Sequence, residues 1–333
     1  MKITLIYGDG IGYEVIHATK EIIDTATDEI EWEVRAAGAD ILESYGTPLP
    51  EETVDSIRRN KIALKGPTAT PVGEGFRSVN VEIRKRLDLY ANLRPIRSFK
   101  GVDALYEDLD MVIVRENTEG LYIGLEEMLD DDTALTKKII TRKASERIVR
   151  FAFDYALKNG RDKVTAVHKA NIMKLTDGLF LESAKKIAKN YTTIDFNDKI
   201  IDALCMDMVM APYKYDVLVA PNFYGDILSD LCAGLVGGLG YAPGANIGDD
   251  VAVFEAVHGT APDILGLGIA NPTSAILSGC MMLGFIGLKR EQELIENALK
   301  TVYEDGKQTY SIDGKLNTNK FKGEIIKLIK NNA

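Results

Sequence analysis

The chain has 333 residues, of which 46% are hydrophobic and 27% are charged, as in an ordinary globular protein with a full core. Its 50 acidic and 40 basic residues leave a net charge of −10, which argues against nucleic acid or an anionic membrane as a partner. The sequence has no apolar run long enough to span a bilayer, no signal or transit peptide at its start, and no cysteine spacing typical of a zinc site or a disulfide framework, so a cytoplasmic protein is expected.

Apolar runs typical of strands alternate with helical periodicity along the chain. Strands are predicted at 2–7, 30–35, 61–65, 110–115, 163–168 and 216–219, and helices at 15–26, 142–158, 175–189 and 292–303. Such alternation predicts an α/β fold in which the strands pair largely in parallel.

Two segments are candidates for crossings between domains. One is the glycine-rich stretch 234–248, and the other is the region near Leu93. If the chain crosses at both, its two ends form one domain and its middle forms another. The predicted large domain comprises 1–97 and 237–333, and the predicted small domain comprises 98–236.

The first strand is followed by a glycine-rich turn, Gly8-Asp-Gly-Ile-Gly12. A dinucleotide fingerprint would need a third glycine at position 13, where the chain has Tyr13. The loss of close helix–strand packing argues against a Rossmann site, and a tight strand-to-helix turn explains these glycines equally well.

Basic residues gather between positions 77 and 97 of this acidic protein. A solvated helix face is the simpler explanation. However, Ser78 stands where a helix N-cap would, and Asn80 and Arg84 are neighbours on one helix face. Arg115 ends a predicted strand, so it could join Arg84 and Arg94 at the carboxyl end of a strand, where α/β proteins bind ligands. Arginines bind carboxylates in a bidentate manner, so this group suggests a substrate with two or three carboxylates.

Tyr122, Lys169 and His258 are candidates by residue type and position. Tyr122 and Lys169 each follow a strand-like stretch and are candidate proton carriers. For Lys169, nearby positive charges would favour the neutral amine, which can accept a proton. Taken singly, each is more often a surface residue. His258 lies in a loop rich in turn formers, where a hydrogen-bonded loop histidine is the simpler explanation.

Three aspartates suggest a metal site. Asp226 and Asp230 lie four apart after the strand at 216–219, and Asp202 precedes them. If a helix begins at Gly225, the first two lie on one face of it, and their repulsion is relieved by a hard cation such as Mg²⁺ or Mn²⁺. An acidic helix N-terminus that complements the helix dipole remains an alternative.

Five segments, in this order, resemble the decarboxylating β-hydroxyacid dehydrogenases, which include isocitrate, isopropylmalate, homoisocitrate and tartrate dehydrogenases. They are 88–95 (DLYANLRP), 114–120 (VRENTEG), 167–174 (VHKANIMK), 222–230 (NFYGDILSD) and 258–263 (HGTAPD). The resemblance covers nearly the whole chain. It implies the two-domain α/β fold of isocitrate/isopropylmalate dehydrogenases rather than a Rossmann fold, with a large cofactor-binding domain built from both chain ends. It also implies a small domain with the metal site and the interface of a homodimer that shares its active sites.

The resemblance assigns a role to each candidate residue. Substrate carboxylates are bound by arginines, a divalent cation is held by aspartates of which one comes from the other subunit, protons move through a tyrosine and the partner's lysine, and a loop binds the adenosine half of the cofactor. In this sequence these are Arg84, Arg94 and Arg115; Asp226, Asp230 and Asp202; Tyr122 and Lys169; and His258, Gly259, Thr260, Ala261, Asp263, Ile264 and Asn271, with Thr70 as a further cofactor contact.

The resemblance is strongest to NAD-dependent isocitrate dehydrogenase, an enzyme of the tricarboxylic acid cycle that oxidises and decarboxylates isocitrate. Ser78 and Asn80 look like the polar pair that meets the γ-carboxylate of isocitrate, whereas an isopropyl group would want apolar contacts. The pair Asp263-Ile264 resembles NAD-dependent members, and the tail 308–314 lacks the tyrosine and arginine spacing of NADP-dependent ones. Homoisocitrate or isopropylmalate as substrate, and a non-catalytic regulatory subunit, remain the alternatives.

Overall fold

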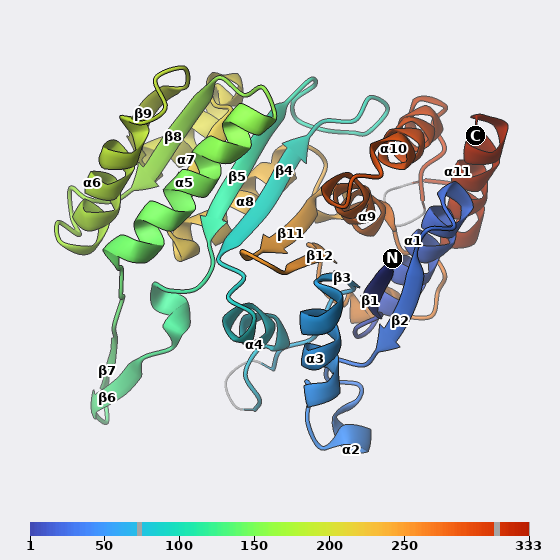
Figure 1. Cartoon of the computed structure of the whole chain (residues 1–333), viewed down its shortest axis with the longest axis horizontal. Coiled ribbons are helices and arrows are strands. Elements are labelled where there is room, and N and C mark those ends of the chain that lie inside the picture. Colours follow the sequence, from blue (N-terminus) through green and yellow to red (C-terminus); the bar gives the residue numbers. More distant parts are fainter. Residues whose placement is uncertain (72–74, 310–313, 333) are drawn as a thin grey trace.

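A ten-stranded sheet runs through the molecule and carries helices on both faces (Figure 1). The computed structural model describes residues 1–71, 75–309 and 314–332. The predicted α/β class is confirmed. From one edge of the sheet to the other, the strands are β2 (Glu31–Arg35), β1 (Lys2–Ile6), β3 (Ile62–Lys65), β12 (Ala252–Ala256), β11 (Pro243–Ile247), β4 (Ala91–Arg97), β5 (Asp110–Glu116), β10 (Val217–Ala220), β8 (Lys163–His168) and β9 (Asp195–Ile200).

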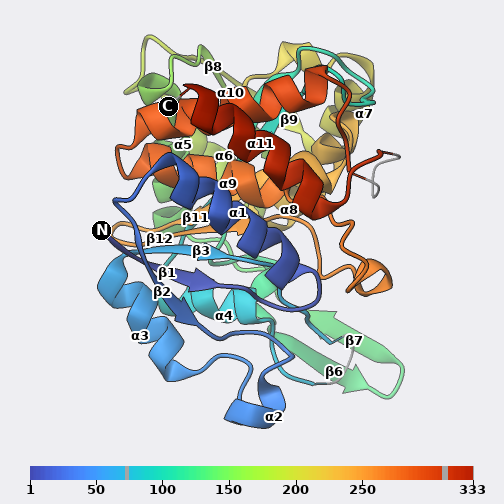
Figure 2. The ribbon, with the colours of Figure 1, turned by 90° about the vertical axis from the view of Figure 1, so that its right-hand side faces the viewer.

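The helices form a group at each end of the sheet. Near β1, β3, β11 and β12, four helices pack on one another (Figure 2): α1 (Gly12–Ala26), α9 (Thr273–Phe285), α10 (Lys289–Glu304) and α11 (Thr318–Asn332). Around β5, β10 and β8 lie α5 (Arg142–Lys158), α6 (Thr176–Ala188), α7 (Ile201–Met210) and α8 (Asn222–Leu235). The remaining helices are α2 (Leu42–Tyr45), α3 (Glu51–Asn60) and α4 (Val79–Arg86), with 3₁₀ turns η1 (Leu121–Ile123), η2 (Pro212–Lys214), η3 (Leu239–Tyr241) and η4 (Pro262–Ile264).

Most sequence predictions of single elements agree with the structure to within three residues. The bounds predicted for α5 and β8 are those observed. The helix predicted to begin at Gly225 instead begins at Asn222. The glycine-rich stretch 234–248 contains the end of α8 and the whole of β11. A domain boundary near 97 and near 237 stays a prediction.

The centre of the sheet departs from parallel pairing. Among the described residues, six of its nine strand pairings are parallel, and the other three join β12, β11, β4 and β5. The β4–β11 pairing spans Ala91–Leu93 and Ala245–Ile247, and stops before Pro95 and Pro243, which have no N–H to donate. Strands β4 and β11, which carry polar side chains, are therefore paired with each other only over this short stretch.

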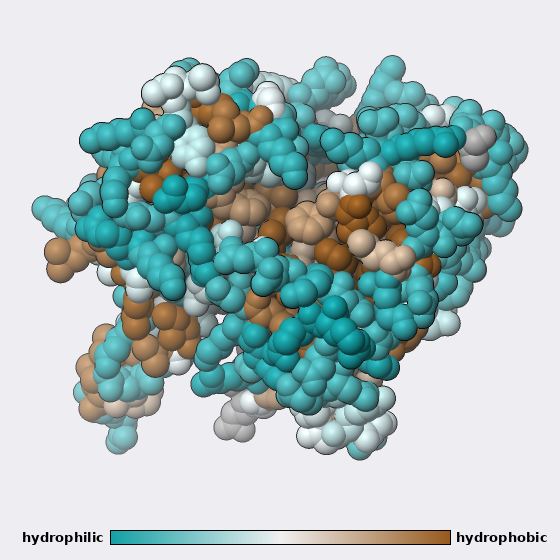
Figure 3. Space-filling view, viewed as in Figure 1, coloured by the Kyte–Doolittle hydropathy of each residue, from teal (hydrophilic) through white to brown (hydrophobic). Residues whose placement is uncertain are grey.

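The two faces of the central strands differ because side chains alternate along a strand. One face of β4 lines a cavity of about 830 Å³ between α5, α9 and α10, with Leu93, Pro95 and Phe254 in its wall. Figure 3 shows apolar side chains on this face, which is the one turned toward the viewer in Figure 1. The opposite face carries two separate hydrophobic clusters, one under α7 and α8 and one under α3 and α4.

A hairpin of β6 (Glu126–Asp130) and β7 (Thr133–Thr136) projects from the body of the molecule, and all of its residues are exposed (Figures 1 and 2). Among the described residues, no helix has the length and apolar character needed to cross a membrane.

Candidate active site

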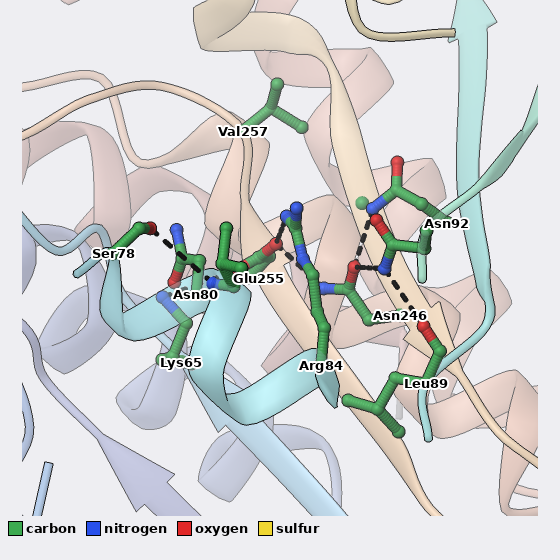
Figure 4. Close-up of polar contacts among 12 residues, drawn as sticks. Lys65, Ser78, Asn80, Arg84, Leu89, Asn92, Asn246, Glu255 and Val257 are labelled. Carbon is green, nitrogen blue, oxygen red and sulfur yellow. Dashed lines mark hydrogen bonds and ion pairs between the residues drawn. The ribbon is translucent and has the colours of Figure 1, made fainter. Parts of the chain in front are cut away.

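A row of polar side chains crosses the sheet between the two smaller hydrophobic clusters. It runs from Lys65 on β3 through Glu255 on β12, Asn246 on β11 and Asn92 on β4 to Arg115 on β5, and Figure 4 labels the first four. Lys65 is the register partner of Glu255, and Asn92 is the register partner of both Asn246 and Arg115. Each of the five is at most 2% exposed. Buried groups of this kind are costly unless paired, so the row marks a candidate active site.

Glu255 is the anionic centre of the row. Its Oε2 lies 3.1 Å from Lys65 Nζ, and its Oε1 accepts from Arg84 Nη2 at 3.0 Å and from Asn246 Nδ2 at 2.7 Å. Burial alone would raise the pKa of Glu255, but the positive charges of Lys65 and Arg84 outweigh it and hold the pKa well below its usual value. The carboxylate therefore stays ionised and anchors Arg84.

Arg84 and Arg94 keep hydrogen-bond donors available although both are buried. Arg84 lies on α4, which Ser78 caps by accepting from the N–H of Val81, as predicted. Arg84 Nε and Arg94 Nη1 have no hydrogen-bond partner among the described residues. Burial, together with the like charges of Arg84 and Arg115, lowers the pKa of Arg94 to about 10. A bound anion would pair these donors and relieve the repulsion.

Arg115 links the arginines to the predicted metal and proton-transfer residues. Its Nε and Nη2 donate to Asn222 Oδ1 at 2.9 and 2.7 Å, and its Nη1 donates to Asp226. The Tyr122 hydroxyl donates to the other oxygen of Asp226, and its ring lies 5.0 Å from the Arg115 guanidinium carbon. A Cβ at Gly225 would lie 2.6 Å from the Arg115 Cβ, so glycine is what lets α8 approach β5 here.

Asp226 and Asp230 lie one turn apart on α8. Because this helix begins at Asn222, neither carboxylate belongs to its first turn, and the alternative of an acidic helix N-terminus loses its basis. Burial and the nearby charge of Asp226 raise the pKa of Asp230. Two carboxylates held this close fit a divalent cation with oxygen ligands.

Asp202 is not near these two aspartates within one chain. It lies on α7, where its Oδ1 accepts from Lys169 Nζ at 2.5 Å. Within the described residues of a single chain, no three His, Cys, Asp or Glu side chains gather into a group that could hold a metal. The single chain thus brings together Asp226, Asp230, Tyr122 and the arginines, and leaves Asp202 with Lys169.

The predicted specificity residues flank the arginines. Asn80 follows Ser78 in the first turn of α4, and its Oδ1 accepts from Thr68 Oγ1 at 3.1 Å (Figure 4 shows Ser78 and Asn80 near Lys65). The Asn80 amide nitrogen is thereby the end left to donate. Thr70 is exposed two residues beyond Thr68. Residues 72–74 of the same segment lie outside the described residues.

The loop predicted to bind adenosine packs against the turn after the first strand. The N–H of Ile11 donates to the Thr260 carbonyl at 3.0 Å, and a Cβ at Gly10 would lie 2.2 Å from the same oxygen. The glycine turn therefore serves close packing of two loops. Gly259, Ala261, Asp263 and Ile264 continue this loop, with Asp263 exposed on η4.

Two buried polar atoms near this loop lack a partner among the described residues, His258 Nε2 and Asn271 Nδ2. Burial lowers the pKa of His258, which favours the neutral ring. Asn271 Oδ1 is fixed by Thr273, so its amide nitrogen is oriented as a donor. Both atoms are left to hydrogen-bond a ligand. Residues 310–313 of the tail, which bear on the choice between NAD and NADP, lie outside the described residues.

Sequence reasoning did not find Glu255, Asn246, Asn92 or Asn222 of the site, nor Asn117, which lies outside it. A signal was present for Asn246 and Glu255, because each is a polar residue inside an otherwise apolar strand segment, whereas Asn92 shares its strand with Arg94 and Arg97. Asn117 Nδ2 donates to Asn246 Oδ1 at 3.0 Å and to the Leu89 carbonyl at 3.0 Å. Nothing in the spacing of these residues indicates such contacts.

Comparison with known proteins gives three kinds of match. The family model for isocitrate/isopropylmalate dehydrogenase matches residues 2–325. A Drosophila melanogaster protein named probable isocitrate dehydrogenase [NAD] subunit alpha, mitochondrial, is 48% identical over 97% of this chain and 86% of its own. A 3-isopropylmalate dehydrogenase from Archaeoglobus fulgidus is 47% identical over 98% of this chain and 99% of its own. The crystal structure of isocitrate dehydrogenase from Methylococcus capsulatus matches with a TM-score of 0.96 and 51% identity, over 99% of both chains.

The expected cytoplasmic location is wrong by this comparison. The Drosophila melanogaster relative is mitochondrial by name, as are relatives from Arabidopsis thaliana, Bos taurus and Sus scrofa at 48% identity. The absence of a transit-peptide pattern at the start of the sequence was therefore not a sound basis for that expectation.

Proposed function

Since the chain belongs to the isocitrate/isopropylmalate dehydrogenase family, we propose that it catalyses the NAD-dependent oxidative decarboxylation of isocitrate to 2-oxoglutarate and CO₂, a reaction of the tricarboxylic acid cycle. The observation that carries this choice is the balance of charge around the polar row. Four cationic side chains, Lys65, Arg84, Arg94 and Arg115, are at most 9% exposed. They lie close to three carboxylates, those of Glu255, Asp226 and Asp230. A fourth buried carboxylate, that of Asp9, also acts on Lys65, but three backbone N–H groups donate to it and compensate its charge.

This balance favours a substrate with three carboxylates. Four positive and three negative side chains leave one positive charge, and a divalent cation held by Asp226 and Asp230 would raise that to three. The pair Lys169–Asp202 is neutral as a unit, so its arrival from a second subunit would leave the sum unchanged. Isocitrate and homoisocitrate carry three carboxylates, whereas isopropylmalate carries two. Buried charge is tolerated only when it is compensated, so the tricarboxylates fit best.

Asn80 and Ser78 support a substrate with a third carboxylate, and isocitrate is the shorter of the two such acids. The Asn80 amide nitrogen is free to donate because its oxygen is held by Thr68. Ser78 caps α4 with its hydroxyl oxygen, and the hydroxyl proton remains available to a carboxylate. Homoisocitrate is the second candidate, because one methylene discriminates by only about 1–3 kcal/mol. Isopropylmalate remains a candidate through the Archaeoglobus fulgidus relative, although its apolar branch would meet these two polar groups.

Asp226 and Asp230, with Asp202 of a second subunit, would hold Mg²⁺ or Mn²⁺. Bound there, such a cation supplies Lewis-acid stabilisation to oxygen atoms that gain negative charge during oxidation and decarboxylation. Protein side chains would bind the substrate and transfer its protons. Arg84, Arg94 and Arg115 bind and orient the carboxylates. Lys169 of the second subunit, after it has released its own proton to solvent beside these positive charges, accepts the hydroxyl proton of the substrate.

Tyr122 is suited to deliver the final proton. Burial, followed by the hydrogen bond to Asp226, raises the pKa of Tyr122, so its hydroxyl stays protonated at neutral pH. Its ring rests beside Arg115, which fixes the hydroxyl next to the predicted metal ligand. An acid so placed would protonate the carbon left by CO₂.

A shared active site in a homodimer would bring Lys169 and Asp202 to the arginines of the other chain. Large apolar side chains are exposed around this pair: Ile172 and Leu175 near Lys169, and Met206 and Val209 on α7. The projecting β6–β7 hairpin exposes Met128 and Leu129 as well. Exposed apolar patches of this kind mark protein interfaces. The Drosophila melanogaster relative is named as a subunit, so assembly with a different chain is the alternative outcome.

The loop from His258 to Ile264 would bind the adenosine half of NAD, together with Asn271 and Thr70. Asp263 is exposed on this loop, where a carboxylate accepts from a ribose 2′-hydroxyl and repels a 2′-phosphate. The proposed cofactor site belongs to the predicted large domain, and the proposed metal site to the predicted small domain.

The proposal is tested by kcat/KM of the purified protein on isocitrate, homoisocitrate and isopropylmalate, each with NAD⁺ or NADP⁺ and Mg²⁺. We expect isocitrate with NAD⁺ to exceed the other combinations by at least about tenfold. EDTA should abolish the activity, and Mn²⁺ should restore it. A preference for isopropylmalate would refute the proposed substrate. Turnover of isocitrate by this chain alone would exclude a purely regulatory subunit.

A further inference from the structure

Buried asparagines form a continuous chain of hydrogen bonds between the two arginines that would bind substrate. Arg94 Nε donates to Asn92 Oδ1 at 2.7 Å, and Asn92 Nδ2 donates to Asn246 Oδ1 at 2.7 Å. Asn246 Nδ2 donates to Glu255 Oε1 at 2.7 Å, and Arg84 Nη2 donates to the same oxygen at 3.0 Å. Figure 4 shows the part of this chain from Asn92 to Arg84.

The chain has a direction, because an asparagine amide has one end that accepts and one that donates. The carboxylate of Glu255 requires a donor, so Asn246 turns its nitrogen toward it and its oxygen toward Asn92. Asn92 must then donate to Asn246 and present its own oxygen to Arg94. The ionised carboxylate thereby fixes the orientation of an amide two links away, and that amide holds the Nε side of Arg94.

The backbone places these groups without freedom to rearrange. Asn92 and Asn246 are register partners on β4 and β11, and they are 0% and 2% exposed. A Cβ at Gly244 would lie 3.1 Å from Arg94 Nη1 and 3.2 Å from Arg94 Cζ. The Arg94 guanidinium is thus held by Asn92 and packs against the bare backbone of Gly244, with Nη1 left unpaired among the described residues.

We propose that Asn92 is a positioning residue for substrate binding. Through Asn246 and Glu255 it aligns the Arg94 guanidinium with that of Arg84, so that both present their unpaired N–H groups to the same anionic substrate. This inference rests on the proposed function. Without the hydrogen bond to Asn92, the Arg94 guanidinium would keep its charge but would no longer be held in one orientation. A bidentate contact with a carboxylate depends on that orientation.

The test is Asn92→Leu, which has a similar volume but can neither accept nor donate. The KM for isocitrate should rise roughly 10- to 100-fold, the effect of losing a hydrogen bond to a charged group. The kcat should change by less than about threefold, as for an interaction made in both ground and transition states. The KM for NAD⁺ should not change, because the asparagine chain does not reach the loop at 258–264.

Asn117→Leu is the matched control. Asn117 is 7% exposed and donates to the same oxygen of Asn246 as Asn92 does, but among the described residues it has no hydrogen bond to either arginine. It should lower the Tm about as much as Asn92→Leu does, and should leave the KM for isocitrate within about threefold of the wild type. Equal rises in KM for the two variants would show a merely structural role and overturn the inference.

A second comparison asks whether Asn92 acts through Arg94. If it does, Asn92→Leu added to Arg94→Lys should raise the KM no further, because the held guanidinium is already gone. Additive effects, or a folded Asn92→Leu variant with wild-type KM, would overturn the inference. If Asn92→Leu does not fold, Asn92→Ser, whose hydroxyl is too short to bridge both neighbours, should show the same rise in KM. A wild-type protein that neither binds nor turns over isocitrate would overturn the proposed function itself, and the inference with it.

Discussion

Replacing Tyr122 with phenylalanine removes one hydroxyl group and keeps the aromatic ring. The ring stays beside Arg115, so the cation–π contact at 5.0 Å is kept, and only the hydrogen bond to Asp226 is lost. Loss of a hydrogen bond to a charged group lowers the free energy of unfolding by about 1.5–3 kcal/mol at most, and by less at this half-buried site. Loss of a general acid lowers kcat by about 10²- to 10⁴-fold, which corresponds to about 3–5 kcal/mol of activation free energy.

The assay follows NADH formation in the first turnover as well as in the steady state. Tyr122→Phe should keep rapid formation of the first equivalent of NADH, because oxidation precedes the proton transfer assigned to Tyr122. Steady-state turnover should fall to about 1% or less of the wild type, with the KM for isocitrate within about threefold.

Tyr191→Phe is a matched control, because the Tyr191 hydroxyl also donates to an aspartate, Asp154, at 2.7 Å, far from the polar row. It should leave turnover unchanged. Wild-type rates for Tyr122→Phe at every step would refute the role of Tyr122 as the acid.

Three further predictions concern specificity, cofactor choice and pH. Asn80→Leu should lower kcat/KM for isocitrate about 10- to 200-fold without a matching loss on isopropylmalate, and equal losses on both acids would contradict its specificity role. Asp263→Ala should raise kcat/KM for NADP⁺ about two- to fivefold by removing an exposed like charge, and no change would argue against contact with the ribose. Burial raises the pKa of Glu119 to about 7 from 4.5, so its proton stabilises the fold below about pH 4.5, and this contribution is lost as pH rises through 7. Glu119→Gln, which can keep both contacts to Thr141, should therefore reduce the fall in Tm between pH 5 and 8, and an unchanged slope would contradict the shift.

The parts of the fold that sequence predicted are those with a strong local pattern. Helix α5 has a long apolar stripe and an N-cap at Thr141, and its predicted bounds match the structure. Strands β4, β11 and β12 were missed, and the first two contain prolines, which argue against central strands. The structure accommodates Pro95 and Pro243 where the β4–β11 pairing has already ended.

The candidate site, like the fold, has a part that could be predicted from the sequence and a part that could not. The arginines and aspartates belong to contiguous motifs, so their residue types and spacing could be interpreted from the sequence. The contacts that orient them join residues far apart in the chain: Asn92 and Asn246 are 154 positions apart, and Arg84 and Glu255 are 171 apart. Which polar residues meet across a sheet depends on strand order and register, and neither has a local signal in one sequence.

We propose that Asp226 and Asp230, completed by Asp202 of a second subunit, hold a divalent cation beside the arginines. The most direct measurement is a crystal structure with Mn²⁺ and isocitrate, in which anomalous scattering locates the metal. We expect one Mn²⁺ between Asp226 and Asp230, within coordination distance of Asp202 of the second subunit and of two substrate oxygens. An ion bound elsewhere, or none with Asp202 still paired to Lys169 of its own chain, would contradict it.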